Sequence, residues 1–115
     1  MHEFVGKWRI THMDLWSPKM VDLLEAGHFQ FYAHGQGHFI FSTIKGRLDV
    51  RINSQTAEIE FSWEGEGQKG RLSGRGKIEF VSPYEGQGTI YIHNSDQSAF
   101  TVKRVASANV VQFVR

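Results

Sequence analysis

The sequence contains no cysteine, which excludes disulfides, thiolate nucleophiles and metal sites built on thiolates. It has no run that approaches the ~20 apolar residues of a membrane-spanning helix. Its first residues lack the basic and then apolar pattern of a signal peptide. Acidic and basic side chains nearly cancel, and a formal net charge of +1 gives no electrostatic case for binding nucleic acid or an anionic membrane. We therefore expect a cytoplasmic protein with neither of those partners.

The 115 residues are enough for one domain, spanning 1–115, with a buried core. The composition is 40% hydrophobic and 22% charged, which is incompatible with a disordered chain. Most of the sequence alternates apolar and polar residues with a period of two, the pattern of strands that bury one face. Composition and period together predict a single all-β domain.

The stretch 58–80 shows this alternation most clearly and predicts a β-hairpin around its glycine-rich centre. A one-residue slip would set apolar residues against charged ones, so few registers are allowed. The register that best matches opposite charges pairs Glu58 with Lys77, Glu60 with Arg75 and Glu64 with Arg71. On the inner face this register places large side chains over strand glycines, a known way to fill a missing side chain. The two inner pairs are Phe61 over Gly74 and Ile59 over Gly76.

The rest of the chain predicts an antiparallel up-and-down meander of about eight strands. The first strand is residues 4–15, and Ser17 and Pro18 then begin one short helix of two to three turns that ends by Gly27. Further strands are expected at 28–33, 37–44, 47–52, 58–64, 71–80, 88–93 and 98–105. The apolar tail 106–115 is a last strand, an arm onto a partner, or a disordered segment. A meander with one apolar face either closes into a barrel or stays a half-open sheet over its helix. Closure removes the strand edges, so we expect a small barrel.

Gly6, Lys7 and Trp8, followed by a short helix and a β-meander, resemble the calycin or lipocalin-like pattern. In that family the tryptophan of G-x-W packs across one end of the barrel. The resemblance therefore implies this place for Trp8, with Arg104 as the arginine that closes the end. The chain is also similar to short uncharacterised bacterial proteins, through Trp63-Glu64-Gly65, Ser73-Gly74-Arg75-Gly76 and His93-Asn94. This second resemblance implies a bacterial protein of the same fold and no particular activity.

Extending the predicted turns across the sheet aligns five polar side chains in one row. A two-residue turn at Lys45 and Gly46, and a polar turn at 53–56, set the registers. The row consists of Ser42, Asp49, Glu60, Arg75 and His93. Asp49 opposite Glu60 is a like-charge pair that costs stability, and Arg75 next to it could compensate. Departures from favourable local pairing tend to occur at functional sites, so this row is a candidate site.

Two carboxylates with a histidine and an arginine suit a polar ligand, a metal ion or acid–base chemistry. The alternative is an ordinary solvated face whose long side chains splay apart. The six histidines are scattered without the spacing of a metal cluster, so we expect no metal and no cofactor. Trp8 and Trp63, with the phenylalanines, either line a ligand cavity or belong to a plain core.

These observations leave three functional hypotheses. The leading one is a small non-enzymatic β-barrel that binds a small ligand or a protein partner, either in an aromatic-lined cavity or at the polar row. The second is an enzyme in which Asp49, Glu60 and His93 act as acid and base while Arg75 holds an anionic group. The third is a homodimeric interaction module, in which the apolar residues 110–114 add to a sheet edge of a second copy.

Overall fold

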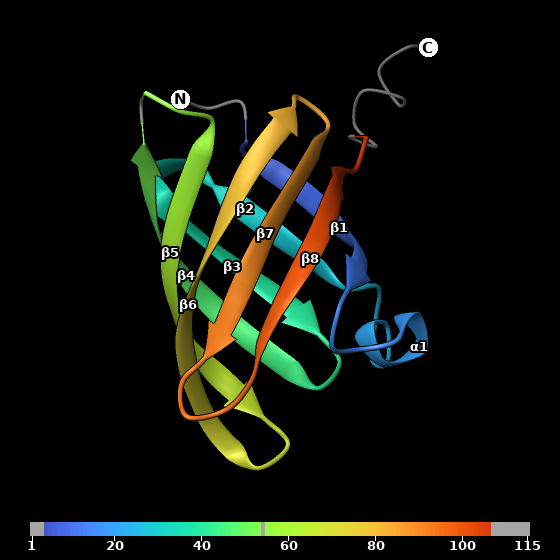
Figure 1. The fold of residues 1–115 in the computed structure, drawn as a ribbon. Helices are drawn as coiled ribbons and strands as arrows, with labels where there is room; N and C mark the ends of the chain where they lie inside the picture. Colours follow the sequence, from blue (N-terminus) through green and yellow to red (C-terminus); the bar gives the residue numbers. More distant parts are fainter. Residues whose placement is uncertain (1–3, 54, 107–115) are drawn as a thin grey trace, which may run out of the picture.

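The alternating segments form eight antiparallel strands that close into a barrel in the computed structural model, which describes residues 4–53 and 55–106 (Figure 1). Each strand pairs with the next along the chain, and β1 pairs with β8 to complete the ring. The elements are β1 (Gly6–Met13), α1 (Pro18–Val21), β2 (His28–Tyr32), the 3-10 turn η1 (Ala33–Gly35), β3 (Gln36–Phe41), β4 (Ile44–Asn53), β5 (Glu58–Gly67), β6 (Gly70–Ser82), β7 (Glu85–Ile92) and β8 (Gln97–Arg104). The all-β meander, its closure into a barrel and the short helix after the first strand are confirmed.

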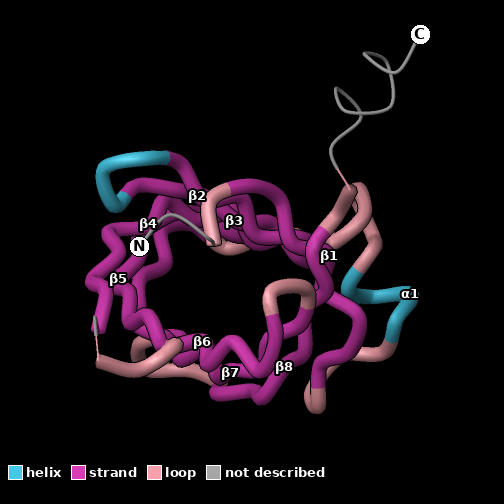
Figure 2. Tube along the Cα trace, turned by 90° about the horizontal axis from the view of Figure 1, so that it is seen from above, coloured by secondary structure: helices cyan, strands magenta, loops and turns pink. Residues whose placement is uncertain are grey.

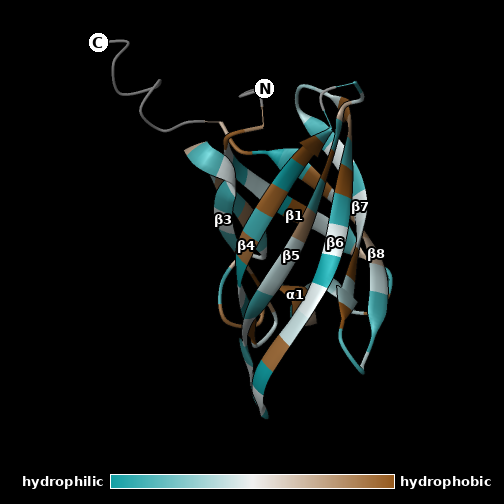
Figure 3. Cartoon of the chain, turned by 90° about the vertical axis from the view of Figure 1, so that its left-hand side faces the viewer, coloured by the Kyte–Doolittle hydropathy of each residue, from teal (hydrophilic) through white to brown (hydrophobic). Residues whose placement is uncertain are grey.

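The interior of the barrel is filled by aromatic side chains. Hydrophobic and hydrophilic bands alternate along the strands in Figure 3, and Figure 2 shows the closed ring from above. The ring of Phe29 on β2 has its centroid 5.8 Å from that of Phe61 on β5 and 5.1 Å from that of Phe100 on β8. Neither strand neighbours β2 in the ring, so these side chains meet across the barrel. The lumen is packed at this level, as eight strands allow.

The hairpin of β5 and β6 forms where predicted, but its register differs by two residues. Glu60 lies opposite Lys77, and Arg75 lies opposite Ser62. The turn consists of residues 68 and 69, because Gly67 pairs with Gly70, whose φ of +122° favours glycine. The predicted pairs of Glu58 with Lys77, Glu60 with Arg75 and Glu64 with Arg71 are therefore wrong. The residues opposite Glu58, Glu60 and Glu64 are Glu79, Lys77 and Ser73.

Aromatic rings do cover strand glycines, with partners shifted by the same two residues. Trp63 lies opposite Gly74 and Phe61 lies opposite Gly76, while Ile59 faces Ile78. A third pair sets Phe39 of β3 against Gly46 of β4. A Cβ added to Gly46 would lie 2.6 Å from Phe39 Cζ and 2.9 Å from Trp63 Cε3. The glycines therefore leave the room that three large rings occupy inside a narrow barrel.

Helix α1 begins as predicted but is a single turn, shorter than the two to three turns expected. Ser17 caps it and Pro18 is its first residue. The carbonyl of Val21 accepts a hydrogen bond from the Ser42 N–H at 2.8 Å instead of continuing the helix. The next residue, Asp22, forms an ion pair with Arg9 of β1 at 2.6 Å. These tertiary partners end the helix and fix the segment that follows it.

One other local prediction is wrong, and β1 departs from a regular strand. The turn between β3 and β4 lies at Ser42 and Thr43 rather than at Lys45 and Gly46, and Ser42 adopts a φ of +55° there. In β1 the pairing with β8 is irregular between Ile10 and His12. Trp8 and Ile10 are buried, so a strict alternation would bury His12 and expose Met13. The irregularity reverses this, and Met13 is buried while His12 is exposed.

Candidate functional site

The polar row that the structure forms shares only Asp49 and Arg75 with the predicted row. Asp49 of β4 lies opposite Ser62 of β5, and Ser62 lies opposite Arg75 of β6. Arg75 in turn lies opposite Tyr91 of β7. All four residues are exposed on the outer face of the barrel.

Glu60 and Ser42 lie elsewhere, so the predicted like-charge pair of Asp49 with Glu60 is wrong. Glu60 belongs to the neighbouring row, between Arg51 and Lys77, where charges alternate as on an ordinary solvated face. Ser42 is buried in the turn after β3, where its N–H is bonded to the helix segment. A two-residue shift in the register of β4 with β5 accounts for the place of Glu60. The turn between β3 and β4 lies three residues earlier than predicted, and this accounts for the place of Ser42.

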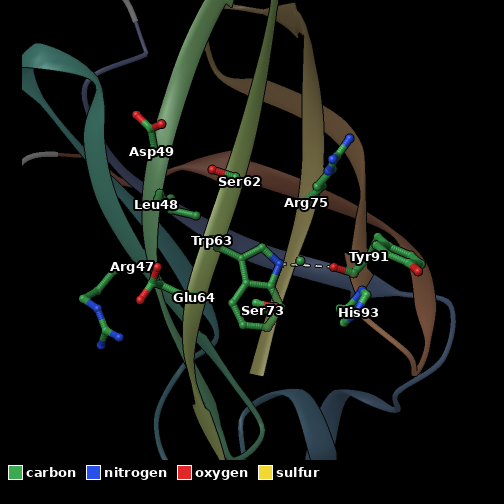
Figure 4. A pocket seen from close by; sticks show the side chains of 11 residues that line it. Arg47, Leu48, Asp49, Ser62, Trp63, Glu64, Ser73, Arg75, Tyr91 and His93 are labelled. Atoms are coloured by element: carbon green, nitrogen blue, oxygen red, sulfur yellow. Dashed lines mark hydrogen bonds between the residues drawn. The ribbon is translucent and has the colours of Figure 1, made fainter. Parts of the chain in front are cut away.

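The outer face of β4–β7 carries an open hollow of about 540 Å³ (Figure 4). Ser62 and Ser73 have short side chains and lie between longer ones, which creates the depression. His93 directly follows β7 and lines the hollow, and its backbone N–H donates to the Ser73 carbonyl at 2.7 Å. Asp49 and Arg75 also line it. Three of the five predicted row residues are thus brought to one hollow by a different register.

The hollow combines both signs of charge. Asp49 and Glu64 lie on β4 and β5, while Arg47 and Arg75 lie on β4 and β6 (Figure 4). The carboxylate of Asp49 is 3.8 Å from Arg51, and both side chains are more than half exposed, so solvent screens this pair. Within residues 4–53 and 55–106, Arg75 forms no ion pair. Its guanidinium can therefore offer paired N–H donors to an anionic group.

Trp63 forms the wall behind the hollow. Its side chain is 3% exposed and belongs to the core, yet its Nε1–H donates to the Tyr91 carbonyl at 3.2 Å (dashed line in Figure 4). This bond ties β5 to β7 across Gly74. The Trp63 indole N–H is therefore a natural reporter of changes in the hollow.

Trp8, the other predicted site tryptophan, lies in a different part of the barrel. Its indole Nε1–H donates to the Phe4 carbonyl at 2.8 Å. The guanidinium carbon of Arg104 lies 4.5 Å from the ring centroid of Trp8. Arg104 also donates to the Val5 carbonyl at 2.9 Å and to the Pro83 carbonyl at 3.0 Å. Trp8 and Arg104 are also paired residues of β1 and β8, so this contact lies where the barrel closes.

The histidines are dispersed. In the described part of the chain, no group of three or more His, Asp or Glu side chains is arranged to hold a metal ion. The rings of His28 and His38 have centroids 5.7 Å apart. The Tyr32 hydroxyl lies 3.0 Å from His38 Nδ1. Burial is the main cause that lowers the pKa of His38, and the charge of His28 lowers it further. His2 lies outside the described residues.

Sequence reasoning missed the side chains that shape the hollow. They are Arg47, Ser62, Glu64, Ser73 and Tyr91. The signal that could have found them is the register, because the observed pairing sets Ser62 and Tyr91 opposite Arg75. The same register aligns Arg47, Glu64 and Ser73 in the next row. The predicted acid–base trio is not assembled, since Glu60 does not line the hollow. The predicted dimer contact at 110–114 lies outside the described residues.

Fold and hollow together define a closed, eight-stranded antiparallel barrel with a polar hollow on its outer face. Comparison of the chain with protein-family models, with curated proteins and with solved structures finds no match. Across residues 4–53 and 55–106, no helix has the length and apolar character needed to cross a membrane.

Proposed function

We propose that this protein is a non-enzymatic β-barrel that binds a small polar ligand in the hollow between Asp49, Arg75 and His93. The observation that carries the proposal is the placement of Arg75, an arginine without a described carboxylate partner, in a hollow of about 540 Å³. Hollows of about 300–1,000 Å³ are typical of small-molecule sites. The packed lumen supports this outer site over an internal cavity.

The side chains of the hollow define the class of ligand. Arg75 suits a carboxylate or phosphate group, which it can hold through two parallel hydrogen bonds. Ser62 and Ser73 can donate or accept, and the carboxylates of Asp49 and Glu64 accept hydrogen bonds from hydroxyl or amino groups. The ligand is therefore a small molecule with one anionic group and several hydroxyl or amino groups.

Binding accounts for the geometry better than acid–base catalysis does. A general acid and base must both reach the reacting group of one substrate. Glu60 lies in the next row between Arg51 and Lys77 and does not line the hollow. The binding proposal needs only Arg75 and its neighbours.

We also propose a relationship to calycins. It is supported by the Trp8 and Arg104 contact, in which the first and last strands of the barrel meet. It is supported further by the up-and-down order of the strands and by the helix after β1.

Native mass spectrometry of the untagged protein, after incubation with the small-molecule fraction of a bacterial lysate, tests the binding proposal. We expect a bound mass that is lost on denaturation and is absent from Arg75→Ala. Lys77→Ala is the matched control, because Lys77 is also exposed on β6 but does not line the hollow. A bound mass that persists in Arg75→Ala, or no bound mass on the wild-type protein, would contradict the proposal.

A further inference from the structure

We propose that the pocket at the Trp8 end of the barrel is a second binding site, specific for a monocarboxylate with an apolar body. The pocket has a volume of about 320 Å³, at the lower end of the range for small-molecule sites. Its walls are mainly apolar and are formed by Phe4, Trp8, Ala57, Phe80, Val81 and Pro83. It shares no residue with the hollow on β4–β7, so this inference does not depend on the function proposed there.

Arg104 is the charged group of this pocket, and the fold holds it in one orientation. Its guanidinium lies over the Trp8 ring, its Nη1 donates to the Val5 carbonyl and its Nε donates to the Pro83 carbonyl. Arginine has five N–H donors, and these two bonds use two of them. The remaining donors are on Nη1 and Nη2, the edge that binds a carboxylate bidentately. Because the side chain is already ordered, a ligand would bind without the cost of immobilising it.

The charge of Arg104 sets the sign of the ligand. Among residues 4–53 and 55–106, no carboxylate lies within ion-pair distance of Arg104, and the residue is partly buried. The acidic Glu85 at the neighbouring turn pairs with Lys103 instead, at 3.7 Å. A partly desolvated cation beside apolar walls favours an anion whose remainder is apolar.

Two of the three tryptophans provide the readout for a test with the full chain. The Trp8 indole N–H is bonded to Phe4 beside the pocket, whereas the Trp63 indole N–H is bonded to Tyr91 behind the hollow. Both signals, assigned with Trp→Phe variants, are followed by NMR during titration with sodium octanoate. We expect a saturable shift of the Trp8 signal and no shift of the Trp63 signal. Octanol should bind at least about tenfold more weakly, because it lacks the charge that Arg104 recognises.

Two matched substitutions test the place of binding. Val81 lines the pocket and Leu24 follows α1, and both side chains are 58% exposed, so a glutamate is tolerated at either position. Val81→Glu should weaken octanoate binding at least about tenfold by repulsion, and Leu24→Glu should leave it unchanged. The proposal is overturned if octanoate gives no saturable Trp8 shift, if octanol binds equally well, or if the two variants behave alike. A shift confined to Trp63 would overturn it while supporting the hollow as a site for anions.

Discussion

The guanidinium carbon of Arg104 lies 4.5 Å from the centre of the Trp8 ring, and the contact joins the last described strand to the first. The same guanidinium bonds to the carbonyls of Val5, before β1, and Pro83, between β6 and β7. One side chain thus connects three segments that are distant in sequence.

Replacement of Arg104 is expected to destabilise the barrel. Arg104→Gln removes the cation–π contact, worth about 0.5–2 kcal/mol, and leaves two carbonyls without their donors. The free energy of unfolding should fall by about 2–3 kcal/mol, measured by urea denaturation with tryptophan fluorescence. Lys103→Gln is the control, since its pair with Glu85 is more than half exposed on both sides, and it should cost less than about 1 kcal/mol. Equal losses in the two variants would show that Arg104 has no special role.

The room that Gly46 leaves for Phe39 can be tested by a double-mutant cycle. Gly46→Ala should destabilise the barrel by about 1–3 kcal/mol, because the new Cβ overlaps the Phe39 ring. Phe39→Leu removes that overlap at its own cost in packing. In the double variant the combined loss should be smaller than the sum of the single losses by at least about 0.5 kcal/mol, measured by urea denaturation. Strict additivity would mean that the overlap with Phe39 is not what excludes a side chain at Gly46.

The ion pair of Asp22 with Arg9 predicts a pH-dependent contribution to stability. The hydrogen bond from Arg9 lowers the pKa of Asp22, and the bond from the Gly27 N–H lowers it further. A carboxylate with a lowered pKa stabilises the fold above its unfolded pKa, about 3.9, and this stabilisation is lost as the pH falls through the folded pKa.

Asp22→Asn should therefore cost about 1 kcal/mol at neutral pH and progressively less below about pH 3.9, measured by urea denaturation. The contribution is small because both side chains are about one-third exposed, at 36% and 34%, and solvent screens them. Asp14→Asn is the control, because Asp14 and its partner His12 are both 62% exposed. An Asp22→Asn loss that is the same at pH 7 and at acid pH would contradict the assignment.

His38 should make the fold sensitive to mild acid. Burial, then the charge of His28, lowers the pKa of His38, and Glu25 partly opposes this shift while Lys7 adds to it. The unfolded chain therefore binds the proton first, and stability should fall as the pH decreases below about 6.5 and level off below the folded pKa. His38→Gln should reduce the fall in urea midpoint between about pH 7 and pH 5. NMR titration should place the His38 pKa below that of an unfolded histidine, and a raised value would contradict the prediction.

The strands could be predicted from sequence because alternation marks the buried face, but their registers could not. A shift of two residues keeps every side chain on its face, so the hydrophobic pattern does not distinguish the predicted pairing of Glu60 with Arg75 from the observed pairing with Lys77. The choice is made by the turn at residues 68 and 69, within a glycine-rich segment that offers several similar turns. The fold could therefore be predicted from the sequence, but the residue pairs between neighbouring strands could not.

The candidate site shows the same limit. Asp49 and Arg75 were assigned to the correct outer face, yet the residue between them is Ser62 rather than Glu60. That difference replaces a carboxylate pair with a small hydroxyl and produces a hollow instead of a charged ridge. The length of helix α1 could not be predicted for a similar reason. The hydrogen bond from the Ser42 N–H to the Val21 carbonyl, which ends the helix, comes from a turn that is distant in sequence.

The pairing of β1 with β8 also has a consequence for connectivity. Because this pair is antiparallel like every other pair in the ring, no strand is distinguished by the architecture as the first or the last. The Val105 N–H donates to the Lys7 carbonyl at 2.9 Å, so the two ends of the described barrel lie together. A circular permutant, joined there and opened between Gln68 and Lys69, would keep the same order of neighbours around the ring. The order of strands around the barrel is therefore cyclic, and the chain termini can be placed at more than one of its turns.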